Sequence, residues 1–477
     1  MEPLHKLEEL LSSIKESDLR LRSVAARLDA LDDLSLYRDE FVLPTHRAVE
    51  ASLCTERADE PCTYLCGNSL GCMPKRSQAL IQEELTVWAS QAVDGHFKHP
   101  KGRNWMTAAD LTHPALAQLV GAQEDEVVCM GTLTANLHLL MNTFYQPTTT
   151  RYRILCEDRP FPSDQYAFAS QVTMHGFNAD DAVVGLAPRA GEYYLRHEDI
   201  LAKITELGES LALVLFPGVQ FYTGQAFKIA EITQAAHDQG AICGWDLAHG
   251  VGNVELEVHS WNVDFAVWCS YKYLNAGPGA IAGLFVHQMW EKSHQPRHAG
   301  WWGHELATRF HMPKLFKPIP GAQGLQQSNP NVFSIAALLG SLQVFSSAGG
   351  MKPIRAKARA LTGYLDRLLR QSPYFVEPSK ASSYSEDGTP MFTVITPQSV
   401  DELGSQLSLL ILPSARARDG LMEQIFAQLL ARGVVGDERR PDVIRLAPVA
   451  LYNRFEDCRA AAAALDEAFS AVASDKK

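Results

Sequence analysis

The chain has 477 residues, of which 46% are hydrophobic and 21% are charged. This composition is typical of a globular protein with a sizeable core, and it excludes disorder as the main state. The 43 basic and 55 acidic residues give a formal net charge of −12, and so acidic a chain without a long Lys/Arg run is a poor candidate for binding nucleic acid or an anionic membrane.

The N-terminal segment is predicted to be helical over residues 1 to about 35, because apolar residues recur there at helical spacing. It is acidic and amphipathic and lacks the apolar run of a signal peptide. No apolar run elsewhere approaches the roughly 20 residues of a membrane helix. We therefore expect a soluble cytoplasmic protein in which residues 1–59 pack with a smaller C-terminal domain.

Nine cysteines, an odd number in a long chain, do not suggest a disulfide framework. Four of them lie close together in the sequence, at Cys54, Cys62, Cys66 and Cys72. Their spacings lack the paired C-x2-C pattern of structural zinc sites. We therefore predict buried or loop thiols and no metal.

Residues 60–330 are predicted to form a large α/β domain. Short, nearly continuous apolar runs at 127–130, 153–155, 211–216, 241–245, 265–269 and 281–286 alternate with helical stretches such as 229–239. Apolar strands that alternate with helices are typical of a mostly parallel sheet buried between layers of helices.

Residues 331–477 are predicted to form a smaller α+β domain. Two helical stretches, 335–345 and 354–369, lead to runs at 391–395, 405–411 and 443–446 that resemble exposed antiparallel strands. A last helix is expected near 460–473.

Two polar residues follow neighbouring strands of the large domain. Asp246 comes directly after the run 241–245, and Lys272 follows the run 265–269, 26 residues further along. Ligands of open α/β sheets bind beyond the carboxyl ends of the strands. Pyridoxal 5'-phosphate (PLP) requires a lysine that forms a Schiff base and an acid that pairs with its protonated pyridine nitrogen. Alone, Asp246 would fit a helix N-cap and Lys272 a surface lysine, but together they favour a PLP site.

Two further segments suit the same cofactor. After the run 127–130, Gly131 and Thr132 form a turn into a predicted helix, and the first helical N–H groups with the Thr134 hydroxyl suit a phosphate. Because Thr is also an ordinary N-cap residue, this segment alone does not identify a phosphate site. After the run 153–155 comes Phe161, followed by turn residues, and its ring could stack on a cofactor face.

Nine short segments, in order between residues 60 and 455, together resemble the kynureninase family of fold-type I PLP hydrolases. They are GNSLG at 67–71, LT at 133–134, FPSD at 161–164, FYTGQ at 221–225, DLAH at 246–249, YKYLN at 271–275, GHE at 303–305, SNP at 328–330 and RLAP at 445–448. The resemblance implies a mostly parallel, seven-stranded type of sheet sandwiched by helices, a smaller α+β domain, a PLP cofactor and a homodimer. It also implies hydrolytic Cβ–Cγ cleavage of L-kynurenine and 3-hydroxy-L-kynurenine to L-alanine plus anthranilate or 3-hydroxyanthranilate, in tryptophan catabolism and de novo NAD biosynthesis.

The resemblance implies a role for individual cofactor-site residues. Lys272 would hold the cofactor and shuttle the substrate Cα proton, Asp246 would pair with the pyridine nitrogen, and Tyr271 would bind the phosphate and act as acid/base at the γ-carbonyl. His249 would support the ring oxygen or the phosphate. The implied cofactor-binding set is Leu133, Thr134, Phe161, Pro162, Ser163, Asp164, Asp246, His249, Tyr271, Lys272, Trp301 and Asn329.

The substrate set is implied in the same way. Arg445 would clamp the substrate α-carboxylate, for which a planar guanidinium is well suited, and a surface ion pair is the alternative. His96 and Asn329 resemble the pair that enzymes preferring 3-hydroxykynurenine carry around the aniline ring, although the segment of His96 is slightly longer than the family pattern. Ser69 and Ser328 complete the implied set.

One position departs from the family pattern. Many members have a serine before the Gly-Val-x-Phe-Tyr-Thr-Gly segment, where this chain has Pro217. A proline supplies neither the hydroxyl nor a backbone N–H. We therefore predict weaker retention of the cofactor, without loss of activity.

The sequence gives less support to three other functions. A fold-type I cysteine desulfurase needs a mobile nucleophilic cysteine near an arginine of the small domain, whereas Cys458 lies in a predicted helix. A PLP-binding protein without activity is disfavoured by the presence of Lys272, Asp246 and Arg445. A nicotinamide-dependent oxidoreductase is disfavoured because the dinucleotide fingerprint is missing.

Overall fold

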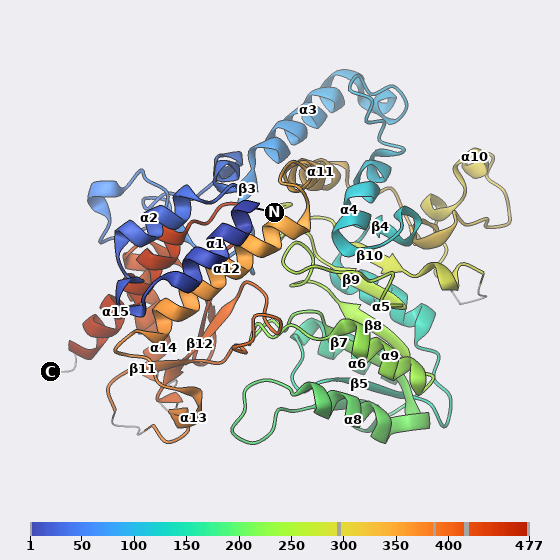
Figure 1. Ribbon diagram of the computed structural model, residues 1–477. Coiled ribbons are helices and arrows are strands. Elements are labelled where there is room, and N and C mark those ends of the chain that lie inside the picture. Colours follow the sequence, from blue (N-terminus) through green and yellow to red (C-terminus); the bar gives the residue numbers. More distant parts are fainter. Residues whose placement is uncertain (1, 293–296, 385–387, 415–418, 475–477) are drawn as a thin grey trace. The chain divides into compact units, whose positions relative to one another are not determined.

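The structure is a computed structural model that describes residues 2–292, 297–384, 388–414 and 419–474 (Figure 1). The chain divides into two compact units. Unit 1 consists of Met1–Lys75, Tyr222–Ala226 and Ser347–Lys477, and unit 2 consists of Arg76–Phe221 and Phe227–Ser346.

Unit 2 contains a seven-stranded sheet with the strand order β4-β10-β9-β8-β7-β5-β6. The strands are β4 (Val127–Cys129), β5 (Arg153–Glu157), β6 (Val183–Leu186), β7 (Leu211–Pro217), β8 (Ile242–Asp246), β9 (Phe265–Trp268) and β10 (Gly283–Val286). β10 runs antiparallel to both of its neighbours, β4 and β9, and the other six strands run in one direction. The predicted mostly parallel sheet is therefore confirmed. The edge strand β6 was not predicted, although its sequence VVGL is apolar; none of its residues is buried.

The helices of this part of the chain are α3 (Lys75–Gln91), α4 (His113–Val120), α5 (Leu133–Phe144), α6 (Pro162–Met174), α7 (Ala179–Ala182), α8 (His197–Leu207), α9 (Ile229–Asp238), α10 (Leu306–Arg309) and α11 (Val332–Ser347). Of these, α4 to α9 contact strands of the sheet. Alternate residues of the central strands, including Leu213 and Leu215 of β7, share a core cluster with apolar side chains of α5 and α6. Helices α8 and α9 also contact β7, and α9 lies in front of the sheet in Figure 1.

Unit 1 is built on a four-stranded antiparallel sheet with the order β11-β12-β15-β14. Its strands are β11 (Met391–Val394), β12 (Leu407–Leu412), β14 (Asp437–Arg439) and β15 (Val443–Leu446), and two short pairs join β1 (Phe41–Val42) with β3 (Met73–Pro74) and β2 (Thr63–Tyr64) with β13 (Val434–Val435). Its helices are α1 (Glu2–Ser13), α2 (Arg22–Ala30), α12 (Met351–Arg370), α13 (Pro378–Ala381), α14 (Leu421–Ala431) and α15 (Phe455–Ser474).

The three predicted strands of unit 1, β11, β12 and β15, are antiparallel as expected, but they are largely buried rather than exposed. Every residue of β12 is buried. Leu407, Leu409 and Ile411 face a core cluster that includes Leu7 and Leu11 of α1. The intervening Ser408, which suggests a solvent-facing position in the sequence, donates its hydroxyl to the carbonyl of Tyr222 at 2.6 Å.

The units differ from the predicted domains in two places. Residues 60–75 lie in unit 1, where β2 pairs in parallel with β13. Residues 331–346 lie in unit 2, because α11 packs on the start of α3: Ser77 Oγ donates to the carbonyl of Ala337 at 2.6 Å. A Cβ atom on Gly340 would lie 2.4 Å from the Ser77 nitrogen, so glycine permits this approach.

Within the described ranges, no single helix has both the length and the apolar character needed to cross a bilayer. Helices α11 and α12 together, as a bent pair, meet those requirements by length and composition alone. The nine cysteines, all of them described, are free thiols.

A buried histidine of unit 2 predicts a pH-dependent stability. Burial lowers the pKa of His113 to about 4, from an ordinary value of 6.5. Between these values the unfolded chain binds a proton that the folded protein does not. The contribution of the neutral His113 to the free energy of unfolding is therefore fully present above pH 6.5. It is lost as the pH drops towards 4, by about 3 kcal/mol in total.

Urea unfolding between pH 7 and 4 measures this contribution. The amide of Gln323 lies 3.1 Å from His113 Nδ1, and His113→Gln keeps a polar group without the titration. We expect a smaller loss of stability on acidification in this variant. An equal dependence of the free energy of unfolding on pH in both proteins would contradict the prediction.

Candidate active site

A cavity of about 190 Å³ opens at the carboxyl edge of the seven-stranded sheet, entirely within unit 2. It lies where β5, β7 and β8 end and where α5 and α6 begin. Its lining residues are Leu133, Thr134, Glu157, Phe161, Ser163, Asp164, Pro217, Val219, Phe221, Asp246, Ala248, His249, Tyr271 and Lys272.

Lys272 and Asp246 meet in this cavity because β8 and β9 are parallel neighbours. Asp246 is the last residue of β8, is 5% exposed, and accepts a hydrogen bond from the Ala248 nitrogen at 2.7 Å. Burial raises the pKa of Asp246, whereas the Ala248 hydrogen bond and then Lys272 lower it. The Lys272 amine lies 2.9 Å from His249 Nε2. The cavity thus places an amine, an imidazole and a carboxyl group together.

Two more carboxyl groups line the same cavity. Asp164 is 3% exposed, and burial, followed by the charge of Asp246, raises its pKa well above the ordinary range. Glu157 is 4% exposed, and burial raises its pKa to about 8. The Oδ1 atom of Asp164 has no hydrogen-bond partner among the described residues. A ligand that carries a donor or a positive charge would satisfy it.

Two helix N-termini converge on the cavity. Helix α5 begins at Leu133 and α6 begins at Pro162, and the hydroxyl oxygens of Thr134 and Ser163 lie 2.5 Å apart. The free N–H groups and the positive dipole ends of helices favour a bound anion. The turn before α5 needs Gly131, whose φ is +54° and where a Cβ atom would lie 2.6 Å from Asn136 Oδ1.

Aromatic rings border the amine. The ring of Phe161 meets that of Phe221 edge-on with centroids 5.3 Å apart. The Lys272 amine lies 5.9 Å from the ring centroids of both Phe161 and Tyr271. Burial, and then the neighbouring Cys269, raises the pKa of Tyr271. Tyr271 is therefore a neutral phenol that can donate a proton, beside apolar faces that suit a flat ring.

The structure brings most of the predicted cofactor residues together. Leu133, Thr134, Phe161, Ser163, Asp164, Asp246, His249, Tyr271 and Lys272 line one cavity, and Pro162 is the first residue of α6. The predicted residues His96, Trp301, Ser328 and Asn329 belong to unit 2 but do not line this cavity, and Ser69 and Arg445 belong to unit 1.

The predicted residues outside the cavity have their own surroundings. The ring of His96 meets that of Trp105 edge-on at 5.2 Å, and its Nδ1 lies 3.1 Å from the carbonyl of Val93. Trp301 is half exposed and packs on Phe310 at 5.4 Å. Ser328 and Asn329 are exposed. Their predicted roles stay predictions.

Arg445 is fully buried in β15 and forms an ion pair with Asp437 of β14. The alternative of a surface ion pair is therefore wrong, because the guanidinium has no exposed area. Buried arginines are retained where a planar donor set is needed. Its predicted role as a carboxylate clamp stays a prediction.

Sequence reasoning missed Glu157 as a lining residue. It is the final residue of β5, so the rule that identified Asp246, an acid at the carboxyl end of a buried strand, applies to it as well. The predicted strand 153–155 stopped short of it. Val219 and Ala248 also line the cavity, and neither carries a polar side chain that could have identified it.

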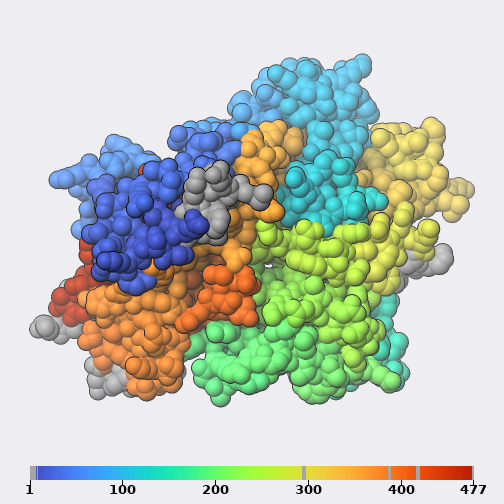
Figure 2. Space-filling model, in the orientation of Figure 1, coloured from blue at the N-terminus to red at the C-terminus, as the bar shows by residue number. Residues whose placement is uncertain are grey.

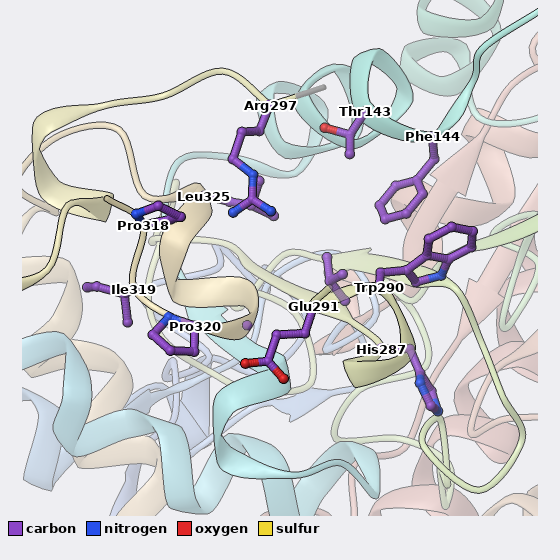
Figure 3. A pocket seen from close by; sticks show the side chains of 12 residues that line it. Thr143, Phe144, His287, Trp290, Glu291, Arg297, Pro318, Ile319, Pro320 and Leu325 are labelled. Carbon is purple, nitrogen blue, oxygen red and sulfur yellow. The ribbon is translucent and has the colours of Figure 1, made fainter. Parts of the chain in front are cut away.

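A second cavity, of about 220 Å³, lies where β10 ends (Figure 3). Because β10 is antiparallel to β9, this end lies at the sheet edge where the parallel strands begin. Trp290, Glu291 and Arg297 are among its lining residues, and none of the predicted site residues lines it.

One cluster of possible metal ligands is found among the described residues: Glu126, His259 and His287, with ligand atoms within 4.8 Å of one another. The carboxylate of Glu126 accepts hydrogen bonds from the nitrogens of Gln123 and Gln288, both at 2.8 Å, and lies 2.9 Å from His259 Nδ1. Its oxygens are therefore already used by hydrogen bonds.

Comparisons with known proteins found family models and relatives that match most of this chain. The family model for aminotransferase class-V matches residues 64–401, and the model for the kynureninase C-terminal domain matches residues 354–465. The kynureninase of Eremothecium gossypii is 48% identical over 420 residues, which cover 88% of this chain and 92% of that protein. The kynureninases of Saccharomyces cerevisiae (48% identical over 90% of this chain and 96% of that protein) and Nematostella vectensis (45%, 95% and 95%) are similar as well.

Solved structures share the fold at low sequence identity. The cysteine desulfurase CsdA of Escherichia coli has a TM-score of 0.68 and 16% identity, with 92% of this chain and 99% of that chain covered. A C-DES mutant with glycine covalently linked to the PLP cofactor has a TM-score of 0.67 and 17% identity, with 85% and 96% covered. Cys458, the cysteine weighed as a desulfurase nucleophile, is fully buried in α15, with its thiol 3.7 Å from the carbonyl of Leu361.

Proposed function

The chain belongs to the kynureninase family, and from this premise we propose that it hydrolyses both L-kynurenine and 3-hydroxy-L-kynurenine, releasing L-alanine with anthranilate or 3-hydroxyanthranilate. Family membership makes it a PLP-dependent hydrolase of C–C bonds. The observation that carries the proposal is the meeting of Lys272 and Asp246 in the cavity where two helices begin. We place the enzyme in the cytoplasm, in tryptophan breakdown and de novo NAD synthesis.

The residues of the cavity fit PLP. Lys272 would hold its aldehyde carbon and Asp246 its pyridine nitrogen, while the first turns of α5 and α6, with Thr134 and Ser163, would hold its phosphate. The unpartnered Asp164 Oδ1 supports this assignment, because a buried acceptor calls for a donor or a cation. When bound, PLP supplies an electron sink for the electron pair left at the substrate Cα.

The chain's own residues then supply the proton transfers. Once the amine of Lys272 is free, it removes the Cα proton of the bound substrate. It can then return a proton to a neighbouring carbon. The His249 imidazole, 2.9 Å from that amine, orients it. Tyr271, neutral because of its burial, donates a hydrogen bond to the γ-carbonyl oxygen as water attacks there. The Cβ–Cγ bond breaks, the aromatic acid leaves, and Cβ takes a proton to give alanine.

For the substrate, we propose that Arg445 binds the α-carboxylate and that His96, Ser69, Ser328 and Asn329 contact the rest of the molecule. The RLAP segment at 445–448 and the family resemblance support the first assignment. A site with polar groups at the aniline ring favours the hydroxylated substrate, because an analogue without the hydroxyl leaves them unpaired.

We also propose a homodimer in which Trp301 and Asn329 reach the cofactor site of the partner copy. Exposed apolar side chains of two unit 2 segments support this, because large apolar patches mark interfaces. They are Trp88, Val93, Phe97, Trp301, Phe310, Met312 (83% exposed) and Leu315 (84%), in the light blue and yellow regions of Figure 2. The rings of Phe97 and Phe310, 6.1 Å apart, join the two segments.

Sedimentation of the wild-type protein and of Met312→Glu tests the proposed homodimer. A monomeric wild type would contradict it.

Turnover of both substrates by the purified protein with added PLP tests the proposed function. We expect cleavage of both, with 3-hydroxy-L-kynurenine the faster. Faster cleavage of L-kynurenine would contradict the roles of His96 and Asn329 and leave the reaction intact. Turnover of neither, or release of sulfide from cysteine, would contradict the proposed function.

Pro217 predicts weak retention of the cofactor. It ends β7, pairs in register with Asp246, and lines the cavity without offering a hydroxyl or N–H group. We expect wild-type protein to lose PLP during gel filtration without added cofactor. Pro217→Ser should lower the dissociation constant roughly tenfold, as one added hydrogen bond would.

Pro217→Ala is the matched control, because it removes the ring without adding a hydroxyl. Equal retention by the alanine and serine variants would show that the proline ring, rather than the missing hydroxyl, matters. Full retention of PLP by the wild type would contradict the prediction.

A further inference from the structure

Glu84 is a buried carboxylate of α3 that binds the segment following this helix (Figure 1). Its side chain is 2% exposed, and three N–H groups point at its two oxygens. Trp105 Nε1 donates at 2.7 Å and Arg103 Nε at 2.9 Å, while His99 Nε2 lies 3.0 Å away. An acid that only accepts hydrogen bonds acts as an ionised carboxylate. Glu84 therefore ties three points of one segment to the helix.

The partners of His99 settle which of its ring nitrogens carries the proton. The Lys101 nitrogen donates to His99 Nδ1 at 3.1 Å, so Nδ1 accepts and Nε2 carries the proton that is donated to Glu84. The His99 nitrogen also donates to Asn104 Oδ1 at 2.8 Å. The segment is thus closed on itself as well as bound to α3.

The indole of Trp105 connects Glu84 to His96. The rings of Trp105 and His96 meet edge-on with centroids 5.2 Å apart. The backbone is joined at the same place, because the Trp105 nitrogen donates to the carbonyl of Gly95 at 3.2 Å and the Met106 nitrogen to that of His96 at 3.3 Å. A Cβ atom on Gly95 would lie 2.6 Å from the indole, so glycine permits this contact. The hydrogen bond from the indole to Glu84 fixes the ring that borders His96.

The orientation of His96 determines what its ring can recognise. Its Nδ1 lies 3.1 Å from the carbonyl of Val93, which can only accept, so Nδ1 carries a proton. In the neutral ring Nε2 is then an acceptor. A phenolic hydroxyl is a donor that matches this acceptor, whereas an aromatic ring without the hydroxyl leaves it unpaired. The ring that fixes His96 therefore affects the choice between the two proposed substrates.

We propose that Glu84 is a positioning residue for substrate selection: through Trp105 it holds His96 in the orientation that accepts a hydroxyl from the aromatic ring of the substrate. This inference deepens the proposed function and rests on its assignment of His96 to the aniline ring. Glu84 is not among the lining residues of the Lys272 cavity, so it acts through the segment that it binds. Loss of its carboxylate should weaken binding of the hydroxylated substrate and leave the chemistry at Lys272 intact.

The test is steady-state turnover of both substrates by the holoenzyme of Glu84→Gln. The amide keeps the shape of the side chain but leaves one oxygen, without a charge, for three N–H groups. We expect KM for 3-hydroxy-L-kynurenine to rise about tenfold, with KM for L-kynurenine and both kcat values within about twofold of the wild type. A general loss of folded protein would instead lower both kcat values together and leave both KM values unchanged.

Glu83→Gln is the matched control. Glu83 is the neighbouring acid on α3 and accepts from Nη2 of the same Arg103 at 2.7 Å, but its side chain is 39% exposed. We expect wild-type KM values for both substrates in this variant, because water screens the pair.

Trp105→Phe keeps the proposal testable if Glu84→Gln does not fold. It removes one N–H group and keeps an aromatic ring beside His96. We expect KM for 3-hydroxy-L-kynurenine alone to rise, by about threefold.

Equal changes of KM for the two substrates in Glu84→Gln, no change in either Glu84→Gln or Trp105→Phe, or the same selective change in Glu83→Gln would overturn the proposal. Hydrogen exchange of residues 95–106 reports on the segment without turnover, and we expect it to be faster in Glu84→Gln. Faster exchange with unchanged selection would show a structural role alone and overturn the proposal as well. A wild type that cleaves neither substrate, or that prefers L-kynurenine, contradicts the proposed function together with this inference, and that failure is seen before any variant is compared.

Discussion

Replacing Lys272 with alanine is expected to abolish turnover, with kcat lowered ~10⁴-fold or more. Lys272 is the one lysine among the described lining residues of the cavity, and its amine lies between His249 and the rings of Phe161 and Tyr271. The variant loses both the covalent attachment of the cofactor and the group that moves the Cα proton. Turnover with added PLP measures the effect, and borohydride reduction of the holoenzyme should label the peptide that contains Lys272 in the wild type alone.

Lys203→Ala is the control for this prediction. Lys203 is a lysine of the same unit that pairs with Glu206 on α8 at 2.8 Å, away from the cavity. We expect this variant to keep wild-type turnover and labelling. Activity of Lys272→Ala within tenfold of the wild type would contradict the role of Lys272, and with it the assignment of the cavity as the active site.

Replacing Lys357 with methionine is expected to lower the free energy of unfolding by about 3–5 kcal/mol. Lys357 of α12 and Asp32 form an ion pair of 2.7 Å in unit 1, and their side chains are 1% and 2% exposed. Burial lowers the pKa of Lys357, and Asp32 raises it. Removing the ammonium group leaves the Asp32 carboxylate buried without its counter-charge. Urea unfolding measures the loss.

Two variants distinguish this cost from a loss of packing. In Lys357→Met with Asp32→Leu, both charges are gone, and most of the stability should return. Arg359→Met breaks another ion pair of α12, with Asp401 at 2.8 Å, whose side chains are 37% and 76% exposed. That pair is screened by water, so its loss should cost less than about 1 kcal/mol. Equal losses from the buried and the exposed pair would contradict the prediction.

The sequence predicts the strands that carry the site well. β8 and β9 were predicted within one residue at each end, because their residues are buried on both faces and form continuous apolar runs. The strand β6 was overlooked although its sequence VVGL is apolar. The burial of β12 was not predicted, because Ser408 bonds to a carbonyl from a distant segment. Burial of that kind depends on which distant segment covers a strand, and the local sequence pattern does not contain this information.

The site residues were predictable where a functional side chain directly follows a strand. Asp246, Lys272 and the start of α5 needed only local sequence and the rule about strand ends. The contact between Thr134 and Ser163 joins residues 29 apart and depends on the packing of α5 against α6, which local sequence does not contain. Glu157 was missed because the expected strand ended two residues early. The predicted substrate residues came from resemblance alone, and none of them is among the lining residues of the cavity.

The way the two units divide the chain also fixes the order in which they can be completed during synthesis. Unit 2 comes from two stretches that end at residue 346, so all of it is translated before residues 347–477 of unit 1. The core of unit 1 joins Leu7 and Leu11 to Leu365 and Phe469. Its N-terminal helices are therefore synthesised long before the C-terminal residues on which they pack. Until then their apolar faces are available to chaperones. A chain truncated near its C-terminus would carry the finished cavity of Lys272 and unpaired N-terminal helices.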